Sequence, residues 1–421
     1  MRKVFVTGVG FISSIGNDYA TVLDSLLNLR TGIELYPPFQ RDDIPVKLSG
    51  TIKGFDLQSN DPEDWVYPKD KAPGRALLRS LAPHGLYCYF AIEQAIAQAG
   101  LTEEQVSNSK TGFHSASAGS PTNLTYYVNR MHQYGVDRLS PKAIVASIPG
   151  TINFSFVSHY KIKGSSCGFV SACASSGHAL GYALDEIRLG RQDRMIIVGA
   201  EDGDLNTILP FAAMRALSPE TTPEKGAKPF DVDRTGFIGT GGAAALVLEA
   251  EDVVAGRGGK PLVEFKGWGQ SSDGFSAVLP EPEGAGLVRS MSHALESAGL
   301  VADDIDYINA HATATIPGDI AELKAIKTVF GADSKVKISS TKALTGHGLS
   351  LSSILEAGIS TVSLVEGICP GTAHLEKLDP EAGNLNVLSK TEKSQPRTAL
   401  SNSSGFGGAN VSLVFEKVGS T

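Results

Sequence analysis

The sequence predicts an α/β fold composed of two similar halves. Apolar, β-branched runs of strand length alternate with helical stretches along the whole chain, a pattern typical of buried and mostly parallel strands joined by helices. The chain has 421 residues, of which 42% are hydrophobic and 19% charged, so it can bury a large core and form two or three domains. Two pairs of similar segments, one member in each part of the chain, indicate an internal duplication.

The alternation begins at the first residues. Residues 3–10 are predicted to form a strand that enters a loop, and Tyr19–Leu29 a helix. The 46 glycines and 21 prolines show no period, which indicates tight turns between short elements and not a fibrous protein. The other predicted elements are helices over Leu86–Gln98, Gly177–Leu189 and Gly286–Ala298, strands over Asp193–Ala200 and 262–274, and a strand that enters a loop within 306–315.

The duplication is clearest in two glycine loops. Gly236–Glu249 and Gly405–Glu416 each contain a glycine-rich loop that leads into an apolar strand ending in Glu. A looser similarity relates 168–188 to 336–358, each a strand, a polar loop and a helix. Chance similarity of glycine loops is the alternative explanation. The two predicted units are 1–255 and 256–421.

Composition narrows the class of protein. The net charge of −8 gives no overall positive field of the kind that attracts nucleic acid. The four cysteines have spacings that match neither a zinc site nor a dense disulfide framework, which fits a reducing compartment. The first residues resemble a signal peptide, but glycines and serines interrupt the apolar stretch and no small-residue cleavage site follows. No apolar run is expected to span a bilayer, so we expect a cytoplasmic protein.

Two motifs that suggest ligands are rejected. Gly8–Ser13 follows a strand like a dinucleotide fingerprint, but Ser13 replaces the third glycine and no convincing acidic residue follows. Asp231–Gly242 begins like a calcium loop, but its twelfth position is Gly242, where the bidentate carboxylate is required. No nucleophile elbow of serine hydrolases and no histidine-pair zinc motif is present. We therefore expect neither a cofactor nor a metal.

Cys173 is the candidate nucleophile. It lies in Val-Ser-Ala-Cys-Ala-Ser-Ser-Gly-His, where small residues end a strand and a helical periodicity begins. A thiol at a helix N-terminus is expected to have a lowered pKa, because unpaired N–H groups and the helix dipole favour the thiolate. A cysteine among small residues is more often part of the core, so this assignment depends on its companions.

Two histidines accompany the cysteine. His311 follows the predicted strand Asp306–Ala310, and His347 follows Ser-Ser-Thr-Lys-Ala-Leu-Thr-Gly, each before a helix. Small residues flank both, as expected where a ligand must approach the backbone closely. One histidine in such a loop is as often a structural hydrogen-bonding group as a catalyst. Two of them, with Lys342 and a cysteine at a helix start, indicate a catalytic set.

Four motifs together identify a family resemblance. SACASSGH around Cys173, NAHATATxxGDxxE around His311, SSTKALTGH ending at His347 and the tail NSSGFGGAN are similar, in order and spacing, to the motifs of elongating β-ketoacyl synthases, which are condensing enzymes of the thiolase superfamily. The resemblance covers nearly the whole chain. It implies the thiolase fold, with two βαβαβαββ halves in five αβαβα layers, and a homodimer, although heterodimers of this fold are possible.

The resemblance also implies an activity. An acyl chain is transferred from acyl carrier protein to Cys173 and then condensed with malonyl-carrier protein, with loss of CO₂, to give a 3-ketoacyl thioester. His311 and His347 are expected to stabilise the enolate, and the backbone N–H groups of Cys173 and Phe406 the oxyanion. One Cys with two His is similar to the elongating branch, whereas initiating synthases have Asn at the second His. Neither a membrane span nor nucleic-acid binding is implied.

Other residues are assigned by the same resemblance. Lys342 and Glu322 are expected to form a buried pair near His311, with Asp319, Thr313 and Thr315 in support. Phe406, between two glycines, is expected to be a mobile gate. For carrier docking we expect Arg215, with help from a basic segment formed by Lys69, Lys71, Arg75 and Arg79; solvated surface charge is the alternative.

The chain departs from the family pattern at three positions. Ala312 stands where the family has glycine, Thr240 where it has an acidic residue, and Ser404 where an aromatic residue precedes the last glycine motif. Ser404 is expected to loosen the gate or enlarge the pocket. Ser404 and Ala312 together favour a specialised polyketide or polyene role over primary fatty acid synthesis. A noncatalytic chain-length-factor-like partner of a heterodimer is the alternative, and the intact Cys–His–His set argues against it.

Overall fold

One mixed sheet of eleven strands organises the molecule. The computed structural model describes residues 1–419, and its sheet has the order β11-β10-β9-β12-β13-β8-β1-β7-β6-β4-β5. A two-stranded ribbon, β2 (Ile33–Leu35) and β3 (Leu48–Gly50), lies apart from it. The strands of the sheet are β1 (Val4–Ile12), β4 (Thr111–Ala116), β5 (Ser166–Phe169), β6 (Arg194–Glu201), β7 (Gly242–Ala250), β8 (Val263–Ser272), β9 (Tyr307–Asn309), β10 (Lys337–Ser339), β11 (Asn386–Val387), β12 (Thr398–Gly405) and β13 (Ala409–Lys417).

The strand order repeats itself. From the middle of the sheet outwards, β1-β7-β6-β4-β5 on one side has the same order as β8-β13-β12-β9-β10 on the other. We call these the first and the second strand set. In each set the strand that comes first in the chain pairs antiparallel with the one that comes last, β1 with β7 and β8 with β13, and the strands at the outer end are parallel. β1 and β8 meet through an antiparallel pairing. The predicted duplication is therefore confirmed, because the two glycine loops lead into β7 and β13, which occupy equivalent places.

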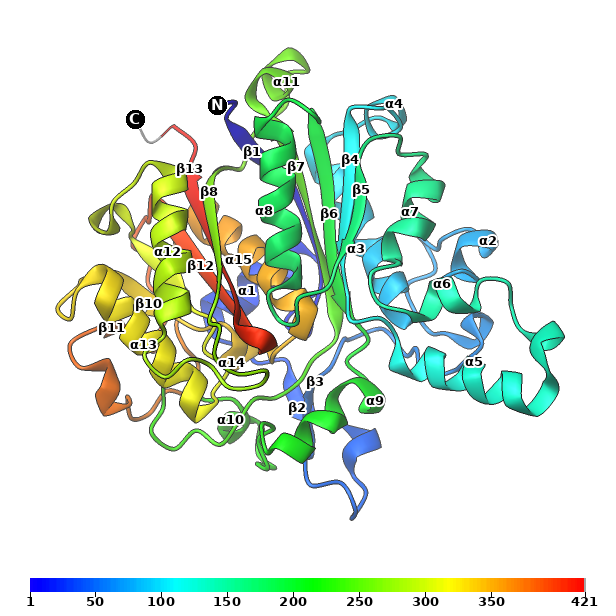
Figure 1. Cartoon of the computed structure of the whole chain (residues 1–421), viewed down its shortest axis with the longest axis horizontal. Helices are drawn as coiled ribbons and strands as arrows, with labels where there is room; N and C mark the ends of the chain where they lie inside the picture. The colour runs from blue at the N-terminus through cyan, green and yellow to red at the C-terminus, as the bar shows by residue number, and fades with distance from the viewer. Residues whose placement is uncertain (420–421) are drawn as a thin grey trace.

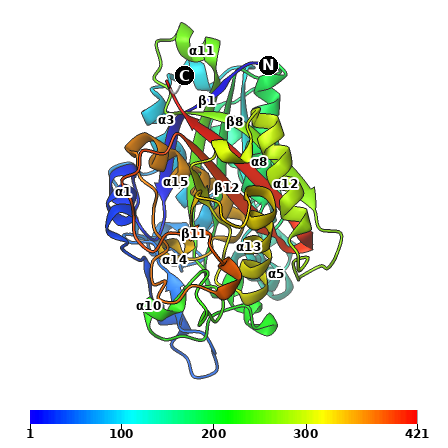
Figure 2. The same ribbon diagram turned by 90° about the vertical axis from the view of Figure 1, so that its left-hand side faces the viewer.

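Helices complete five layers. α8 (Ser175–Arg188) and α15 (Ser352–Glu366) pack against each other between the two strand sets (Figures 1 and 2). α3 (Pro83–Ala99) covers the outer face of the first set, and α12 (Ala285–Ala298) with α13 (Ile316–Phe330) that of the second. The other helices are α1 (Tyr19–Asn28), α2 (Arg75–Leu78), α4 (Glu103–Val106), α5 (Pro121–Tyr134), α6 (Ala143–Ser147), α7 (Ile152–Tyr160), α9 (Leu205–Ile208), α10 (Pro223–Gly226), α11 (Glu251–Gly256) and α14 (Lys342–Thr345), with short 3₁₀ turns.

The central helix α15 is buried on all sides over most of its length. Every residue of α15 from Ser352 to Leu364 is buried, and Gly358 allows the Phe11 ring of β1 to pack against the helix backbone. Leu349–Glu366 has the length and apolar composition of a membrane-spanning helix, so the expectation that no stretch reaches that length was wrong. However, 89% of this stretch lies inside the protein, as expected for a core helix.

The strand ends assemble one region. The segments that follow β5, β9, β10 and β12 meet in one region of the molecule, and strand ends are where ligands of α/β proteins commonly bind. Cys173 follows β5, His311 follows β9, His347 follows β10 and Phe406 follows β12. The fold thus gathers residues from both strand sets.

Candidate active site

Cys173 lies in a tightly held turn between β5 and α8. The preceding Ala172 has φ of 50°, a conformation that non-glycine residues rarely adopt. The Ser175 hydroxyl donates to the Ala172 carbonyl at 2.6 Å, and Ser353 Oγ donates to the Cys173 carbonyl at 3.1 Å. A Cβ on Gly405 would lie 3.1 Å from the Cys173 nitrogen, so only glycine allows this close approach.

His347 faces the thiol. Its Nε2 lies 3.0 Å from Cys173 Sγ, and its Nδ1 lies 3.0 Å from Ser352 Oγ. Its backbone N–H donates to Ile238 at 2.7 Å, and its carbonyl accepts from Thr240 N at 3.1 Å. The segment that contains Thr240 therefore holds the His347 turn through backbone hydrogen bonds that do not involve the Thr240 side chain.

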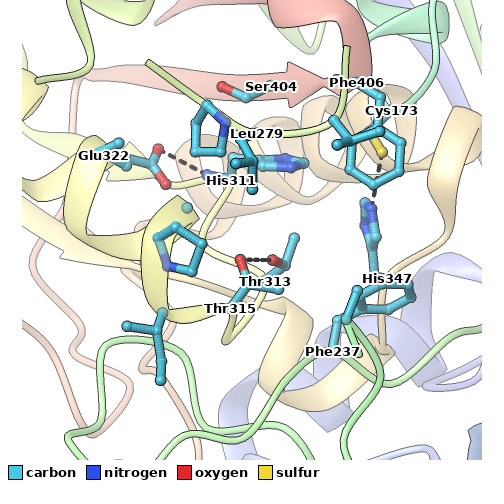
Figure 3. A pocket seen from close by; sticks show the side chains of 18 of the residues that line it. Cys173, Phe237, Leu279, His311, Thr313, Thr315, Glu322, His347, Ser404 and Phe406 are labelled. Carbon is cyan, nitrogen blue, oxygen red and sulfur yellow. Dashed lines mark hydrogen bonds between the residues drawn. The ribbon is translucent and has the colours of Figure 1, made fainter. Parts of the chain in front are cut away.

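His311 completes the set (Figure 3). Its ring centroid lies 5.3 Å from that of His347, with the rings nearly perpendicular. Its backbone N–H donates to Glu322 Oε1 at 2.9 Å, and that of Ala312 to Glu322 Oε2 at 2.7 Å. The buried Nδ1 of His311 has no hydrogen-bond partner within residues 1–419. Glu322 thus fixes the loop and leaves the ring free for a ligand.

The predicted pairing of Lys342 with Glu322 was wrong. Lys342 Nζ is bonded to Glu356 of α15, and both side chains are buried. Glu322 instead accepts the two backbone N–H groups of the His311 loop and the side-chain amide of Asn402 at 3.2 Å. The reason lies in the tertiary structure. α14 begins at Lys342, and α15 brings Glu356 to its side chain, whereas Glu322 on α13 faces the loop that follows β9.

The predicted supporting residues lie around the same loop. Asp319 accepts the backbone N–H of Phe230 at 2.9 Å and of Ala314 at 3.2 Å, and Arg234 lies 3.4 Å away. Thr313 and Thr315 hydroxyls lie 3.1 Å apart and line the cavity described next. Asp319 therefore shapes the loop, whereas the threonines face the cavity.

A cavity of about 610 Å³ leads to the three residues. Cys173, His311 and His347 lie on its wall, and apolar side chains line much of the remainder, including Met214, Val278, Leu279, Leu287, Ile316 and Phe406. Such a mainly apolar cavity with a few convergent polar groups is typical of an enzyme site. Ser404 also lines it, and its hydroxyl donates to Asn410 Oδ1 at 2.8 Å.

Phe406 lies above the thiol at the turn between β12 and β13 (Figure 3). Its side chain is 37% exposed, and its ring centroid lies 5.9 Å from that of Phe211. The next residue, Gly407, has φ of 77°, and a Cβ there would meet nothing within 4 Å. The turn is thus open to movement on one side.

Burial dominates the electrostatics of the set. It raises the pKa of Cys173 to about 12, and the charge of Lys342 opposes this only in part. The expectation of a lowered thiol pKa at the helix start is therefore overturned: α8 begins at Ser175, two residues after the thiol, and desolvation of a thiolate outweighs the effect of the helix end. Burial, followed by the charge of Lys342, holds the pKa of both histidines well below the usual value. The resting set is a neutral thiol with two neutral imidazoles.

The set is also compact enough to contact a metal ion, because one ligand atom from each of the three residues lies within 4.8 Å of the others. Two observations favour an acid–base pair instead. The 3.0 Å distance from sulfur to nitrogen is that of a hydrogen bond. The same Lys342 charge that disfavours imidazolium also disfavours a second cation.

The basic residues predicted for carrier docking do not all lie at the cavity. Arg215 is exposed and lines the cavity. None of the described atoms of Lys69, Lys71, Arg75 or Arg79 lines it. Arg75 and Arg79 both donate to Glu63, at 2.8 and 3.0 Å, so their charge is partly neutralised. These four residues therefore do not line the cavity, and their help in carrier docking stays a prediction.

Sequence reasoning missed several residues of the site. Glu356 is the acidic residue in the otherwise uncharged stretch Ser352–Val365, a position that indicates a buried partner. Ser352 follows His347 by five residues, and nothing in the sequence distinguishes it from its neighbouring serines. Phe237, whose ring centroid lies 5.2 Å from that of His347, had no recognisable pattern.

Comparisons with known proteins agree with this geometry. Residues 1–253 match the family model of the N-terminal domain of beta-ketoacyl synthase, and residues 262–376 that of its C-terminal domain. The 3-oxoacyl-[acyl-carrier-protein] synthase 1 of Haemophilus influenzae is 37% identical over 99% of both chains. The Escherichia coli K12 protein of the same name is 34% identical over 99% of this chain and all of its own.

Solved structures give the same result. A crystal structure of a beta-ketoacyl synthase from Burkholderia phymatum superposes with a TM-score of 0.91, at 29% identity over 99% of this chain and 100% of that one. The ishigamide ketosynthase/chain length factor superposes with a TM-score of 0.86, at 26% identity and the same coverage. The fold is therefore the thiolase-type ketosynthase fold, and the chain belongs to the β-ketoacyl synthase family.

Proposed function

We propose that this protein is an elongating 3-oxoacyl-[acyl-carrier-protein] synthase that condenses an acyl group held on Cys173 with a malonyl unit. The main support for this proposal is the position of the Cys173 thiol, whose sulfur lies 3.0 Å from His347 Nε2, with His311 alongside, on the wall of a mainly apolar cavity. The full-length relatives are named for this reaction. Their names support fatty acid synthesis in preference to the specialised role expected from Ser404 and Ala312.

The first half-reaction is acyl transfer. The neutral thiol needs a base, and the low pKa of His347 leaves its Nε2 free to take the S–H proton as sulfur attacks the acyl thioester. The sulfur–acyl bond forms, the bond to the carrier sulfur breaks, and the proton passes to the departing carrier thiol. The backbone N–H groups of Cys173 and Phe406 are proposed to hold the oxyanion.

The second half-reaction is condensation. The malonyl thioester loses CO₂, and the resulting enolate oxygen needs N–H donors, which His347 and His311 can supply as neutral imidazoles. Ser352 Oγ can accept from Nδ1–H or donate to Nδ1, so it supports either tautomer of His347. The enolate carbon attacks the acyl thioester, the bond to Cys173 sulfur breaks, and the released thiolate takes a proton from solvent water.

The remaining residues support these steps. Lys342, paired with Glu356, is proposed to keep both imidazoles neutral through its charge. Glu322 and Asp319 hold the His311 loop. Thr313 and Thr315 present hydroxyls to the cavity, where they can bind the amide groups of a carrier's prosthetic arm.

Carrier docking and assembly complete the proposal. Arg215 at the cavity is proposed to contact an acidic carrier protein. A homodimer is proposed through β5, because this edge strand leaves backbone groups unpaired, with exposed Ile144, Phe154 and Val170 beside it. We further propose that the chain divides into units 1–255 and 256–421, and that it acts in the cytoplasm.

Purified protein tests the function directly. Incubation with acyl carrier substrates of several lengths and malonyl-carrier protein should give 3-ketoacyl product, and intact mass should show the acyl group on Cys173. A protein that is never acylated would fit the noncatalytic alternative. Mass measured in solution, with Val170→Arg as the interface variant, distinguishes a homodimer from a monomer that waits for a different partner.

A further inference from the structure

A buried carboxyl group, that of Glu201, lies close to the active site and has no place in the mechanism above. Glu201 ends β6, and no part of it is exposed. Its Oε1 accepts the Ala118 backbone N–H at 3.1 Å and the hydroxyl of Ser350. Its Oε2 has no hydrogen-bond partner within residues 1–419. One oxygen therefore links a loop of the first strand set to the turn after His347.

The Ser350 turn controls where His347 points. Gly348–Leu351 form the turn between His347 and α15, and Leu349 has φ of 50°, so the turn must be held in a conformation that leucine rarely adopts. Ser352, at its end, contacts His347 Nδ1. β6 packs directly against this turn. The Ser350 hydroxyl thus joins this turn to the first strand set by a side-chain hydrogen bond.

We propose that Glu201 is a positioning residue which, through Ser350, fixes the turn that aims the His347 imidazole at the Cys173 thiol, and which does so in its protonated form. The proposal deepens the proposed function, because it takes Cys173 and His347 as the reacting pair. A protonated carboxyl group is compatible with complete burial and one unpartnered oxygen, whereas a carboxylate there would be an uncompensated charge.

The electrostatic surroundings agree. Burial raises the pKa of Glu201 to about 7, against hydrogen bonds from Ser350 and Ala118 and the nearby His84, while Asp202 raises it further. His84 and Asp202 pair with each other at 2.7 Å. A folded pKa above the ordinary value of 4.5 means that the group is neutral below about pH 7 and that stability is lost as pH rises from 4.5 through 7.

Ionised Glu201 also acts on the nucleophile. Its charge, like that of Glu356, raises the pKa of Cys173, whereas Lys342 lowers it. Above about pH 7 the growing charge on Glu201 should therefore oppose the normal gain in thiol reactivity. A neutral replacement of the same shape should remove this opposition.

The test measures alkylation of Cys173 by iodoacetamide, followed by intact mass from pH 6 to 9.5, together with acyl transfer. We expect Glu201→Gln to retain most of its reactivity at pH 6 and to react at least about threefold faster than wild type at pH 9, since one pKa unit changes the thiolate fraction tenfold. Ser350→Ala should slow acyl transfer about tenfold, because the turn that positions His347 loses its hydrogen bond to Glu201. Glu201→Leu should slow acyl transfer further, because it also leaves the Ala118 backbone N–H without its acceptor.

Ser360→Ala is the matched control. Ser360 is a fully buried serine of α15 whose hydroxyl has no partner within the described chain, so we expect wild-type behaviour. If Ser350→Ala and Glu201→Gln both match wild type in rate and pH profile, Glu201 is only a packing residue and the proposal is wrong. Alkylation needs no carrier protein, so a failure of the proposed function appears separately, as no condensation in a protein whose alkylation profile is as expected. Ser350→Ala still decides the matter if Glu201→Leu does not fold.

Discussion

The loop that carries Cys173 and the loop that carries His347 occupy the same place in two copies of one fold. The first joins β5 to α8 and the second joins β10 to α15, and both helices lie in the central layer. Their side chains have diverged, so one loop supplies a nucleophile and the other a base and hydrogen-bond donor. A duplicated backbone thus brought two different groups together about a common centre.

The two loops also differ in what holds them, and each is held by the other strand set. The Cys173 loop receives a hydrogen bond from Ser353 of α15 and contacts Gly405 of β12. The His347 loop is bonded through its backbone to Ile238 and Thr240, which precede β7. Neither half contains a complete site, so the catalytic set forms only when both halves pack in one core.

The largest effect is expected for Cys173→Ser, which removes the nucleophile from the first of the two loops. A hydroxyl has a far higher pKa than a thiol and is a poor nucleophile near neutral pH, so we expect condensation to be abolished. Product formation from acyl and malonyl carriers measures this, with circular dichroism as the control for folding. Retention of more than a few per cent of wild-type product would overturn the role of Cys173.

Replacing the histidines separates the tasks of the two loops. We expect His347→Asn to lower decarboxylation about 10²–10³-fold and to slow acyl transfer too, because its Nε2 contacts the thiol. His311→Asn should lower decarboxylation and leave acyl transfer largely intact, since within residues 1–419 the hydrogen bond to the Cys173 sulfur comes from His347 and not from His311. Single-turnover acylation and CO₂ release measure the two steps. Equal loss of both steps in both variants would contradict this division.

Lys342 and Glu356 test the corrected pairing. Removing one partner of a buried ion pair typically costs about 3–5 kcal/mol of stability, so we expect Glu356→Gln to lower the free energy of unfolding strongly. A double-mutant cycle should show coupling between Lys342 and Glu356 and little between Lys342 and Glu322. Urea unfolding measures both. Stronger coupling to Glu322 would restore the pairing predicted from sequence.

Arg215→Glu probes docking at the mouth of the cavity. We expect KM for acyl-carrier substrate to rise about tenfold at low salt, with the difference shrinking at high salt because added ions screen exposed charges. Arg79→Glu is the matched control, because Arg79 lies off the cavity and bonds Glu63. An unchanged, salt-insensitive KM for Arg215→Glu would remove Arg215 from the docking surface.

Phe406→Ala should have the smallest effect. The backbone N–H remains, but the thiol loses the ring that covers it, so we expect a few-fold lower condensation and weaker discrimination between short and long acyl donors. Acylation of Cys173 by donors of several lengths, compared with product release, measures this. A variant with the wild-type rate and length profile would make Phe406 wall packing and not a gate.

Much of this protein was predictable from local patterns. Periodicity gave the predicted helices and strands, which the structure confirms within a few residues, since alternation of apolar residues reflects burial directly. The order of four short motifs indicated Cys173, His311 and His347 as one set, and the glycine loops indicated the duplication. These features depend on residues close together in the chain, so sequence alone determined them.

Only the tertiary structure decided the rest. Lys342 lies 20 residues from Glu322 and 14 from Glu356 in the sequence, and the path of α15 made Glu356 its partner. The same packing raised the pKa of Cys173 when the local helix start predicted the opposite. Pairing and desolvation depend on which segments meet in the core and exclude water, and neither can be read from neighbours along the chain.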